Sequence, residues 1–190
     1  MKIYFTAPIK GVELIENHIK EIYETIKKLG YIQIDDIVNR LNQGDDFYEK
    51  LDKGGKNTHS FYFEETITKI KSSDINIFEC SIPSLGVGFQ VVKSLDYNKP
   101  TIVLYQKDNL PHFLAGTQND KFFLREYTSK NLVNVVTNTI EEAKHAADKR
   151  FNFFISPSLL SYLEEESKKF DMTKSAFIRK LIIEHKKKSR

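Results

Sequence analysis

Short apolar runs alternate with longer amphipathic segments through the first 148 residues of the chain. This alternation is typical of a parallel β-sheet whose strands are connected by helices. Segments with apolar residues at every third or fourth position predict helices at residues 12–29, 63–72, 88–97 and 131–148. The short apolar runs predict strands at residues 3–6, 31–34, 75–80, 101–105 and 121–125. We therefore expect an α/β domain with a flavodoxin-like or Rossmann-like parallel five-stranded sheet, flanking helices, and a ligand site at the carboxyl ends of its strands.

One segment of this region, residues 42–60, does not follow the pattern. It is polar and contains Gly44, Gly54 and Gly55. Long polar segments without apolar periodicity usually form functional or irregular loops. We expect residues 42–60 to form a mobile excursion over a site or an interface.

After residue 148 the pattern changes to one short strand and two short helices. Alternating residues predict a strand at 150–155, and Ser156 followed by Pro157 predicts the start of a helix that continues to Phe170. A second helix is expected from Thr173, with apolar and basic residues. About 40 residues cannot bury all these apolar side chains alone, so a second copy of the chain is implied. We accordingly divide the chain into residues 1–148 and residues 149–190.

Charge separates the same two parts of the chain. The 190 residues carry a net charge of only +3, from 29 Lys and Arg against 26 Asp and Glu, which neither requires nor excludes a polyanionic partner. Residues 1–148 hold 18 basic and 21 acidic residues, a net charge of −3, whereas residues 149–190 hold 11 and 5, a net charge of +6. Any contact with a polyanion is therefore expected in the last 42 residues.

The remaining composition narrows the class of protein. The single cysteine, Cys80, excludes a disulfide framework within one chain and a multi-cysteine metal site, and the histidines lack metal-ligand spacing. No apolar run is long enough for a membrane span, and the first residues lack a secretory signal. We expect a cytoplasmic protein without a cofactor.

A glycine-containing motif follows the strand at 75–80. It reads Pro83-Ser84-Leu85-Gly86-Val87-Gly88-Phe89-Gln90. The two glycines let the backbone approach a ligand, the helix N-terminus behind them attracts phosphate, and Ser84 offers a hydroxyl donor. An ordinary turn between strand and helix is the alternative. Glu79, beside the motif, is expected to bind a ribose hydroxyl or to brace loop amides.

Two segments of the chain carry a resemblance to a known family. Residues 3–11, Ile-Tyr-Phe-Thr-Ala-Pro-Ile-Lys-Gly, and residues 73–79 leading into the glycine motif resemble the nucleoside 2-deoxyribosyltransferase superfamily, and in it the 2'-deoxynucleoside 5'-phosphate N-hydrolases. The resemblance covers about residues 1–145. It implies cleavage of the N-glycosidic bond of a deoxynucleotide or deoxynucleoside, with a glutamate that attacks the anomeric carbon and an aspartate that helps protonate the departing base. A first-strand tyrosine orients the glutamate, and serines, one from a neighbouring subunit, hold the 5'-phosphate.

The site residues implied by this resemblance are matched only in part. The nucleophile's position is Gln90, the aspartate's is about Thr66, and Glu64 and Glu65 are either displaced acids or part of a solvated helix face. The matching positions are Tyr4, Ser84, Gly86 and Gly88. The ligand-binding turn after the first strand comprises Thr6, Pro8, Lys10 and Gly11, with Pro8 in place of a phosphate-binding serine. The partner subunit's serine falls near Pro111 or His112.

Gln90 leaves more than one interpretation open. If Gln90 is native, the pocket binds a nucleotide or nucleoside without efficient cleavage, and the chain is a ligand-responsive regulator. If Gln90 replaces a glutamate to trap a ligand, the natural protein is a hydrolase or transferase with an oligomerising tail. Thr66 favours the first interpretation, because a trapping change would not alter two positions. A third option is an assembly protein with a vestigial pocket.

The last 42 residues resemble the ribbon-helix-helix family. The resemblance implies a homodimer or a higher homo-oligomer whose paired strands enter the major groove of double-stranded DNA. Phe151, Phe153 and Ile155 would face the core. The residues expected to contact DNA are Arg150, Asn152 and Phe154 from the strand, and Thr173, Lys174 and Ser175 at the start of the second helix. Dimerisation without DNA, or a toxin protein or RNA as partner, are the alternatives.

Overall fold

The structure is a computed structural model that describes residues 1–146 and 153–189. The chain divides into two compact units, Met1–Asp148 and Lys149–Arg190. No helix of the described residues is long and apolar enough to cross a membrane.

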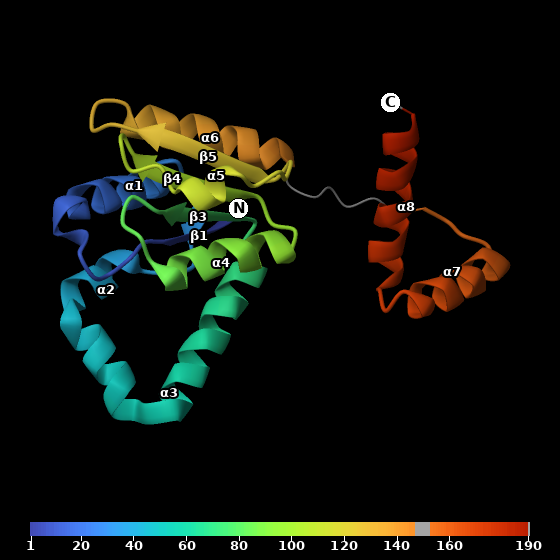
Figure 1. Cartoon of the computed structure of the whole chain (residues 1–190), viewed down its shortest axis with the longest axis horizontal. Helices are drawn as coiled ribbons and strands as arrows, with labels where there is room; N and C mark the ends of the chain where they lie inside the picture. The colour runs from blue at the N-terminus through green and yellow to red at the C-terminus, as the bar shows by residue number, and fades with distance from the viewer. Residues whose placement is uncertain (147–152, 190) are drawn as a thin grey trace. The chain divides into compact units, whose positions relative to one another are not determined.

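The first unit contains one parallel sheet of five strands (Figure 1). The strand order is β2-β1-β3-β4-β5, and every neighbouring pair is parallel. The predicted α/β architecture is therefore confirmed, with strand ends shifted by one or two residues. The strands are β1 (Lys2–Thr6), β2 (Ile32–Gln33), β3 (Ile75–Glu79), β4 (Thr101–Gln106) and β5 (Phe122–Tyr127).

Helices cover both faces of this sheet, and strand alternation decides which face each side chain enters. Ile3 and Phe5 of β1 pack into a core with α1 (Glu16–Lys28) and α6 (Leu132–Ala146). Tyr4, between them, points to the opposite face, where it packs in a second core beside α4 (Leu85–Asp96). The alternation thus places the Tyr4 side chain on the same face of the sheet as α4.

The segment at 42–60 is helical, so the prediction of an irregular excursion was wrong. It belongs to α2 (Ile37–Gln43) and α3 (Asp45–Ser72). Gly44 has φ 53° and separates the two helices, and Gly55 has φ 65° and breaks α3. Both values lie in the left-handed region that favours glycine. The glycines therefore mark bends between helical segments, and Figure 1 shows α3 bent away from the sheet.

Two other helices differ from their predicted bounds. Residues 12–29 form a short 3-10 helix, η1 (Val12–Leu14), followed by α1. The helix predicted from residue 88 begins at Leu85, because the Ser84 hydroxyl accepts a hydrogen bond from the Val87 amide and caps it. A short helix that the pattern did not predict, α5 (His112–Ala115), lies between β4 and β5.

The second unit contains the two expected helices, α7 (Pro157–Lys169) and α8 (Lys174–Lys188). Leu163 and Phe177 are buried between them, and the rings of Phe170 and Phe177 stack at 5.6 Å. The predicted strand at 150–155 is absent from its described part, residues 153–155, and residues 150–152 lie outside the described residues. A lone strand has no neighbour to complete its hydrogen bonds.

Candidate functional site

The central contact of the site joins Tyr4 of β1 to Gln90 of α4. The Tyr4 hydroxyl donates a hydrogen bond of 2.8 Å to Gln90 Oε1. Burial raises the pKa of Tyr4 above its usual range, while the nearby Arg40 charge opposes this shift. Tyr4 is therefore a neutral donor that fixes the orientation of the Gln90 amide.

A cluster of four charged side chains lies beside Tyr4. We call Asp35, Arg40, Glu65 and Lys69 the charged cluster. Asp35 forms ion pairs with Arg40 and with Lys69, whose Nζ lies 2.8 Å from Asp35 Oδ1, and Lys69 also pairs with Glu65 at 2.7 Å. Arg40 Nη2 also donates to Thr6 Oγ1 at 3.2 Å. The cluster thus connects α2 and α3 to the carboxyl end of β1.

Aromatic side chains of α3 lie next to this cluster. The Phe47 ring centroid lies 5.3 Å from that of Tyr48 and 5.5 Å from that of Tyr62. Tyr62 is close enough to Tyr4 and Arg40 to perturb the pKa of both. Lys10 Nζ lies 4.6 Å from the Tyr48 ring centroid, so α3 also contacts the turn after β1.

The two glycines of the motif lie inside the helix and not, as the sequence predicted, in a turn ahead of it. Gly86 and Gly88 lie in the first turns of α4, and neither has a positive φ. A Cβ atom at Gly88 would meet nothing within 4 Å, and one at Gly86 would only reach Ser84 Oγ at 4.0 Å. The glycines are therefore not needed for the backbone conformation, and they leave the N-terminus of α4 uncovered, as phosphate binding requires.

The turn after β1 has a different character from a phosphate-binding turn rich in hydroxyl groups. Pro8 is buried and supplies neither a hydroxyl nor an amide donor. Gly11 has φ 74°, which lets the chain reverse before η1. Lys10 is the exposed cation of this turn. An anion at this position would be held by the Lys10 charge.

Glu64 and Glu65 do not join the Tyr4–Gln90 contact. Both line a separate hollow of about 440 Å³ on α3, together with Phe61 and Lys69. Thr66, in contrast, is buried and lies one helical turn from Tyr62, so the two share a face of α3. Both acids are exposed, and Glu65 pairs with Lys69 of the charged cluster.

Glu79 braces the chain at the end of β3. Its Oε1 accepts hydrogen bonds from the Ser81 amide at 3.1 Å, from the Ser81 hydroxyl and from the Tyr127 hydroxyl at 3.0 Å. Ser81 Oγ in turn accepts from the Gln106 amide at 2.6 Å. Burial raises the pKa of Glu79, and its Oε2 is buried without a partner. These contacts support the loop-bracing interpretation.

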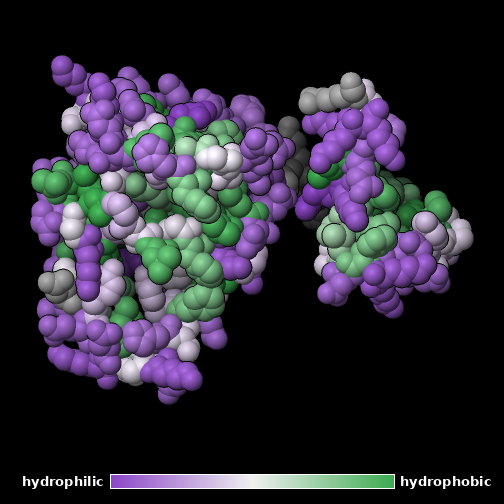
Figure 2. Space-filling model, in the orientation of Figure 1, coloured by the Kyte–Doolittle hydropathy of each residue, from purple (hydrophilic) through white to green (hydrophobic). Residues whose placement is uncertain are grey.

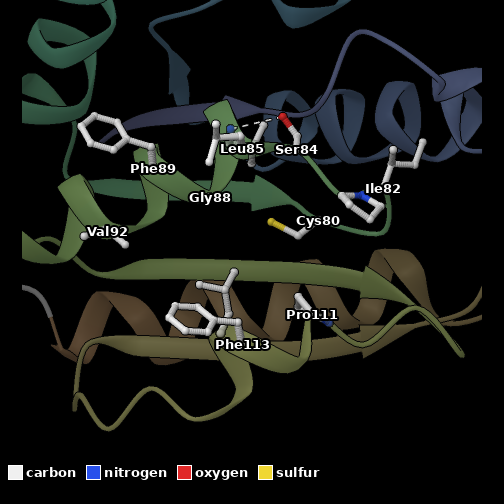
Figure 3. A pocket seen from close by; sticks show the side chains of 12 residues that line it. Cys80, Ile82, Ser84, Leu85, Gly88, Phe89, Val92, Pro111 and Phe113 are labelled. Atoms are coloured by element: carbon white, nitrogen blue, oxygen red, sulfur yellow. Dashed lines mark hydrogen bonds between the residues drawn. The ribbon is translucent and has the colours of Figure 1, made fainter.

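An apolar hollow of about 360 Å³ is lined by residues of α4, by the segment before it and by residues around α5 (Figure 3). Leu85 and Phe113 project beside it and are each 94% exposed. Figure 2 shows apolar side chains gathered over this part of the surface. Such a lining suits a protein surface better than a phosphate. The lining residues include Cys80, Ile82, Pro83, Val87, Phe89, Val92, Pro111 and Leu114.

Of the residues of the second unit that were predicted to contact DNA, some lie among the described residues. Thr173 Oγ1 accepts a hydrogen bond of 3.2 Å from the Ala176 amide and so caps α8. Lys174 pairs with Glu164 of α7, and Ser175 and Phe154 are exposed. Arg150 and Asn152 lie outside the described residues.

The sequence pattern did not indicate three members of the charged cluster, Asp35, Arg40 and Lys69, nor the aromatic residues of α3; Glu65 was expected only as a displaced acid or a solvated side chain. Asp35 directly follows the second apolar run, where a polar side chain reaches the carboxyl edge of a sheet. That position is the feature of the sequence that could have indicated Asp35 as a site residue. Lys69 is 34 residues away from Asp35, so no local motif joins them.

Comparison with known proteins relates the chain to enzymes that act on deoxynucleotides. A candidate 2'-deoxynucleoside 5'-phosphate N-hydrolase 1 of Thermofilum pendens is 28% identical over 148 residues, covering 78% of this chain and 93% of that protein. One of Nematostella vectensis is 26% identical over 72% of this chain and 92% of its own length. The 5-hydroxymethyl-dUMP N-hydrolase of Tetraodon nigroviridis is 24% identical over 76% of this chain and 100% of its own length.

Two further comparisons complete this picture. No protein-family model matches the chain. The solved structure of the CMP N-glycosidase BcmB of Clostridium botulinum aligns with 74% of this chain and 99% of that protein, with 12% identity and a TM-score of 0.45. The sequence similarities to the N-hydrolases support a relationship of this chain to the nucleoside 2-deoxyribosyltransferase-like superfamily.

Proposed function

We propose that the first unit binds a deoxynucleoside 5'-monophosphate or deoxynucleoside and hydrolyses its N-glycosidic bond. The observation that carries the proposal is the 2.8 Å hydrogen bond from Tyr4 to Gln90, which orients a polar side chain of α4 beside the end of β1. Sequence relatives named as deoxynucleotide N-hydrolases, matched over 92% or more of their length, support it. The uncovered N-terminus of α4 and the Lys10 charge suit a 5'-phosphate.

Gln90 sets the form of the reaction. An amide is not a carboxylate nucleophile, so water forms the new bond to the anomeric carbon. Gln90 Oε1 is held by Tyr4, and its amide nitrogen has no hydrogen bond among the described residues. That nitrogen can donate to a sugar oxygen. Gln90 thus positions the sugar. When the N-glycosidic bond breaks, its electron pair moves to the base.

Binding without turnover is the second candidate function. It is favoured by the neutral side chains at Gln90 and Thr66, since a glycosidic transition state gains from negative charge near the sugar and from an acid that protonates the base. In this case the first unit senses a nucleotide and regulates the second unit. The same pocket would then act as a receptor.

Product analysis separates the two candidates. The full chain is incubated with each deoxynucleoside and its 5'-monophosphate, and free base is measured by chromatography. Release of base that Tyr4→Phe slows supports hydrolysis. A rise in melting temperature with the same ligand but no base supports binding alone. Neither base nor a thermal shift would contradict both functions.

We also propose that the apolar hollow beside α4 receives a second copy of this chain. A two-fold interface needs a surface that is complementary to itself. Here the projecting side chains of Leu85 and Phe113 stand beside a hollow of the same face. His112, next to Phe113, then lies near the partner, as the resemblance implies for a phosphate contact. Sedimentation of wild type and Leu85→Asp tests this, and an unchanged mass for the variant would contradict it.

For the second unit we propose pairing with another copy and binding to double-stranded DNA. Its charge of +6 and the capped N-terminus of α8 suit a phosphate backbone. Its two helices expose apolar side chains that only a partner can bury. These side chains are Leu159, Leu160, Tyr162, Leu181, Ile182 and Ile183.

Fluorescence anisotropy of the intact chain with duplex DNA at two salt concentrations tests the DNA proposal. Binding that weakens with salt and with Lys174→Ala supports it, because fewer counterions are then released. Lys20→Ala, in the first unit, is the matched control. Absence of binding at low salt would contradict DNA recognition. Pulldown of RNA or of a toxin protein would then identify that molecule as the partner instead of DNA.

A further inference from the structure

Arg40 is a buried cation with hydrogen-bonding capacity to spare. Its side chain is only 12% exposed, and Nη2 serves both Asp35 and Thr6. Arg40 Nε is buried and has no hydrogen-bond partner in the structure. A guanidinium carries five N–H donors and always remains charged. Because Nε is enclosed by the chain, the donors left for a group outside it are those of Nη1, which makes no hydrogen bond among the described residues.

The charges around Arg40 differ in how far they are exposed to water. Asp35 is 6% exposed and is shared between two cations, Arg40 and Lys69. The second anion of the charged cluster, Glu65, is 44% exposed, so water screens its charge. Lys69, which pairs with Glu65, is itself 26% exposed, so the buried part of the cluster is the Arg40–Asp35 pair. Next to it, Tyr4 and Gln90 are neutral.

Nucleotide hydrolysis produces charge of both signs when the glycosidic bond breaks. The electron pair of the C1'–N bond moves to the base nitrogen, and positive charge develops on the sugar. Water then forms the C1'–O bond and releases a proton, which the base takes up after departure. A guanidinium with unused donors is complementary to the base, where negative charge develops.

We propose that Arg40 is a catalytic residue that donates hydrogen bonds to the departing base and stabilises its negative charge. The proposal rests on the hydrolysis proposed above and identifies the preferred substrates. Bases that leave as anions and carry a carbonyl acceptor, namely the keto pyrimidines, fit a guanidinium. Adenine, which lacks a carbonyl oxygen, fits it poorly.

The dependence of rate on the acidity of the leaving base tests this role. Hydrolysis of 5-fluoro-dUMP, dUMP and dTMP is measured for wild type, Arg40→Gln and Arg40→Lys. We expect Arg40→Gln to slow dTMP, which has the least acidic base, at least tenfold more than 5-fluoro-dUMP, and Arg40→Lys to fall between. An equal loss for all three substrates would overturn the proposal, because a merely structural role lowers every rate alike.

Two controls keep the test conclusive. Arg40→Gln alone leaves the buried Asp35 carboxylate without one of its cations. The double variant Asp35→Asn with Arg40→Gln removes this carboxylate as well, and thermal unfolding reports whether each variant folds. If wild type hydrolyses nothing, the proposed activity fails, and binding of free 5-fluorouracil, uracil and thymine at one pH tests Arg40 separately. Tighter binding of the more acidic base, lost in Arg40→Gln, supports the contact. Equal binding by wild type and Arg40→Gln overturns it.

Discussion

Substitution of Gln90 by glutamate tests the position of this side chain directly. Glutamate has the same shape as glutamine, so the Tyr4 hydroxyl still donates to the oxygen that it now holds at 2.8 Å. The change therefore introduces a negative charge with little change in packing. If Gln90 lies beside the sugar, Gln90→Glu should accelerate base release.

The size of the gain follows from the charge. A unit negative charge about 4 Å from a cationic sugar carbon contributes about 4 kcal/mol at an effective dielectric constant of ~20. This corresponds to about three orders of magnitude in rate. Asp35 and Arg40 lie nearby, and the positive charge of Arg40 neutralises part of the new negative charge. We expect an increase of roughly 100-fold to 1000-fold.

The assay is base release from a deoxynucleoside 5'-monophosphate at saturating substrate. Gln90→Ala is the control, because it removes the amide without adding charge, and it should show no gain. Adding Tyr4→Phe to Gln90→Glu should remove roughly 10-fold to 100-fold of the gain, since a hydrogen bond to a carboxylate is lost. A folded Gln90→Glu protein that releases base no faster than wild type would refute the placement of Gln90 at the anomeric carbon.

Three further predictions concern stability. Burial raises the pKa of Glu79 in the folded chain. The contribution of Glu79 to the free energy of unfolding is therefore greatest below pH ~4.3, and it is lost at about 1.4 kcal/mol per pH unit as the pH rises toward the folded pKa. Urea unfolding should show the free energy of unfolding of Glu79→Gln gaining on that of wild type from pH 4 upward, and a constant difference would contradict this. Asp35→Asn leaves two cations without their shared carboxylate and should lower the free energy of unfolding by about 3 kcal/mol, measured by circular dichroism, whereas the exposed Glu142→Gln should change it by less than about 1 kcal/mol. Thr173→Ala removes the cap of α8 and should lower it by about 1 kcal/mol, whereas Ser175→Ala should not.

The sheet could be predicted because its strands are buried on both faces. Such strands are nearly continuous apolar runs, and β3 is buried at every position. The first half of α3 could not be predicted in the same way, because its side chains are largely polar and exposed. Helical periodicity is read from a buried stripe, and this part of α3 buries very little.

The residues of the candidate site could be predicted only where they lie in a recognisable local motif. Tyr4, Ser84 and Gln90 stand in segments that resemble a family, and the structure brings Tyr4 and Gln90 together. Arg40 belongs to no such segment. Its contacts depend on how α2 folds back onto the end of β1, which a local pattern of residues does not record.

The neutral Gln90 and the unused donors of Arg40 have one physical explanation. A site without negative charge near the sugar loses stabilisation of the sugar cation, and the neutral Gln90 supplies no such charge. The same loss removes competition for Arg40, whose spare donors are then free for the base instead of pairing with a carboxylate on α4. Under the role proposed for Arg40, the departure at Gln90 and the presence of Arg40 are linked, because together they would move the main electrostatic stabilisation from the sugar to the leaving base.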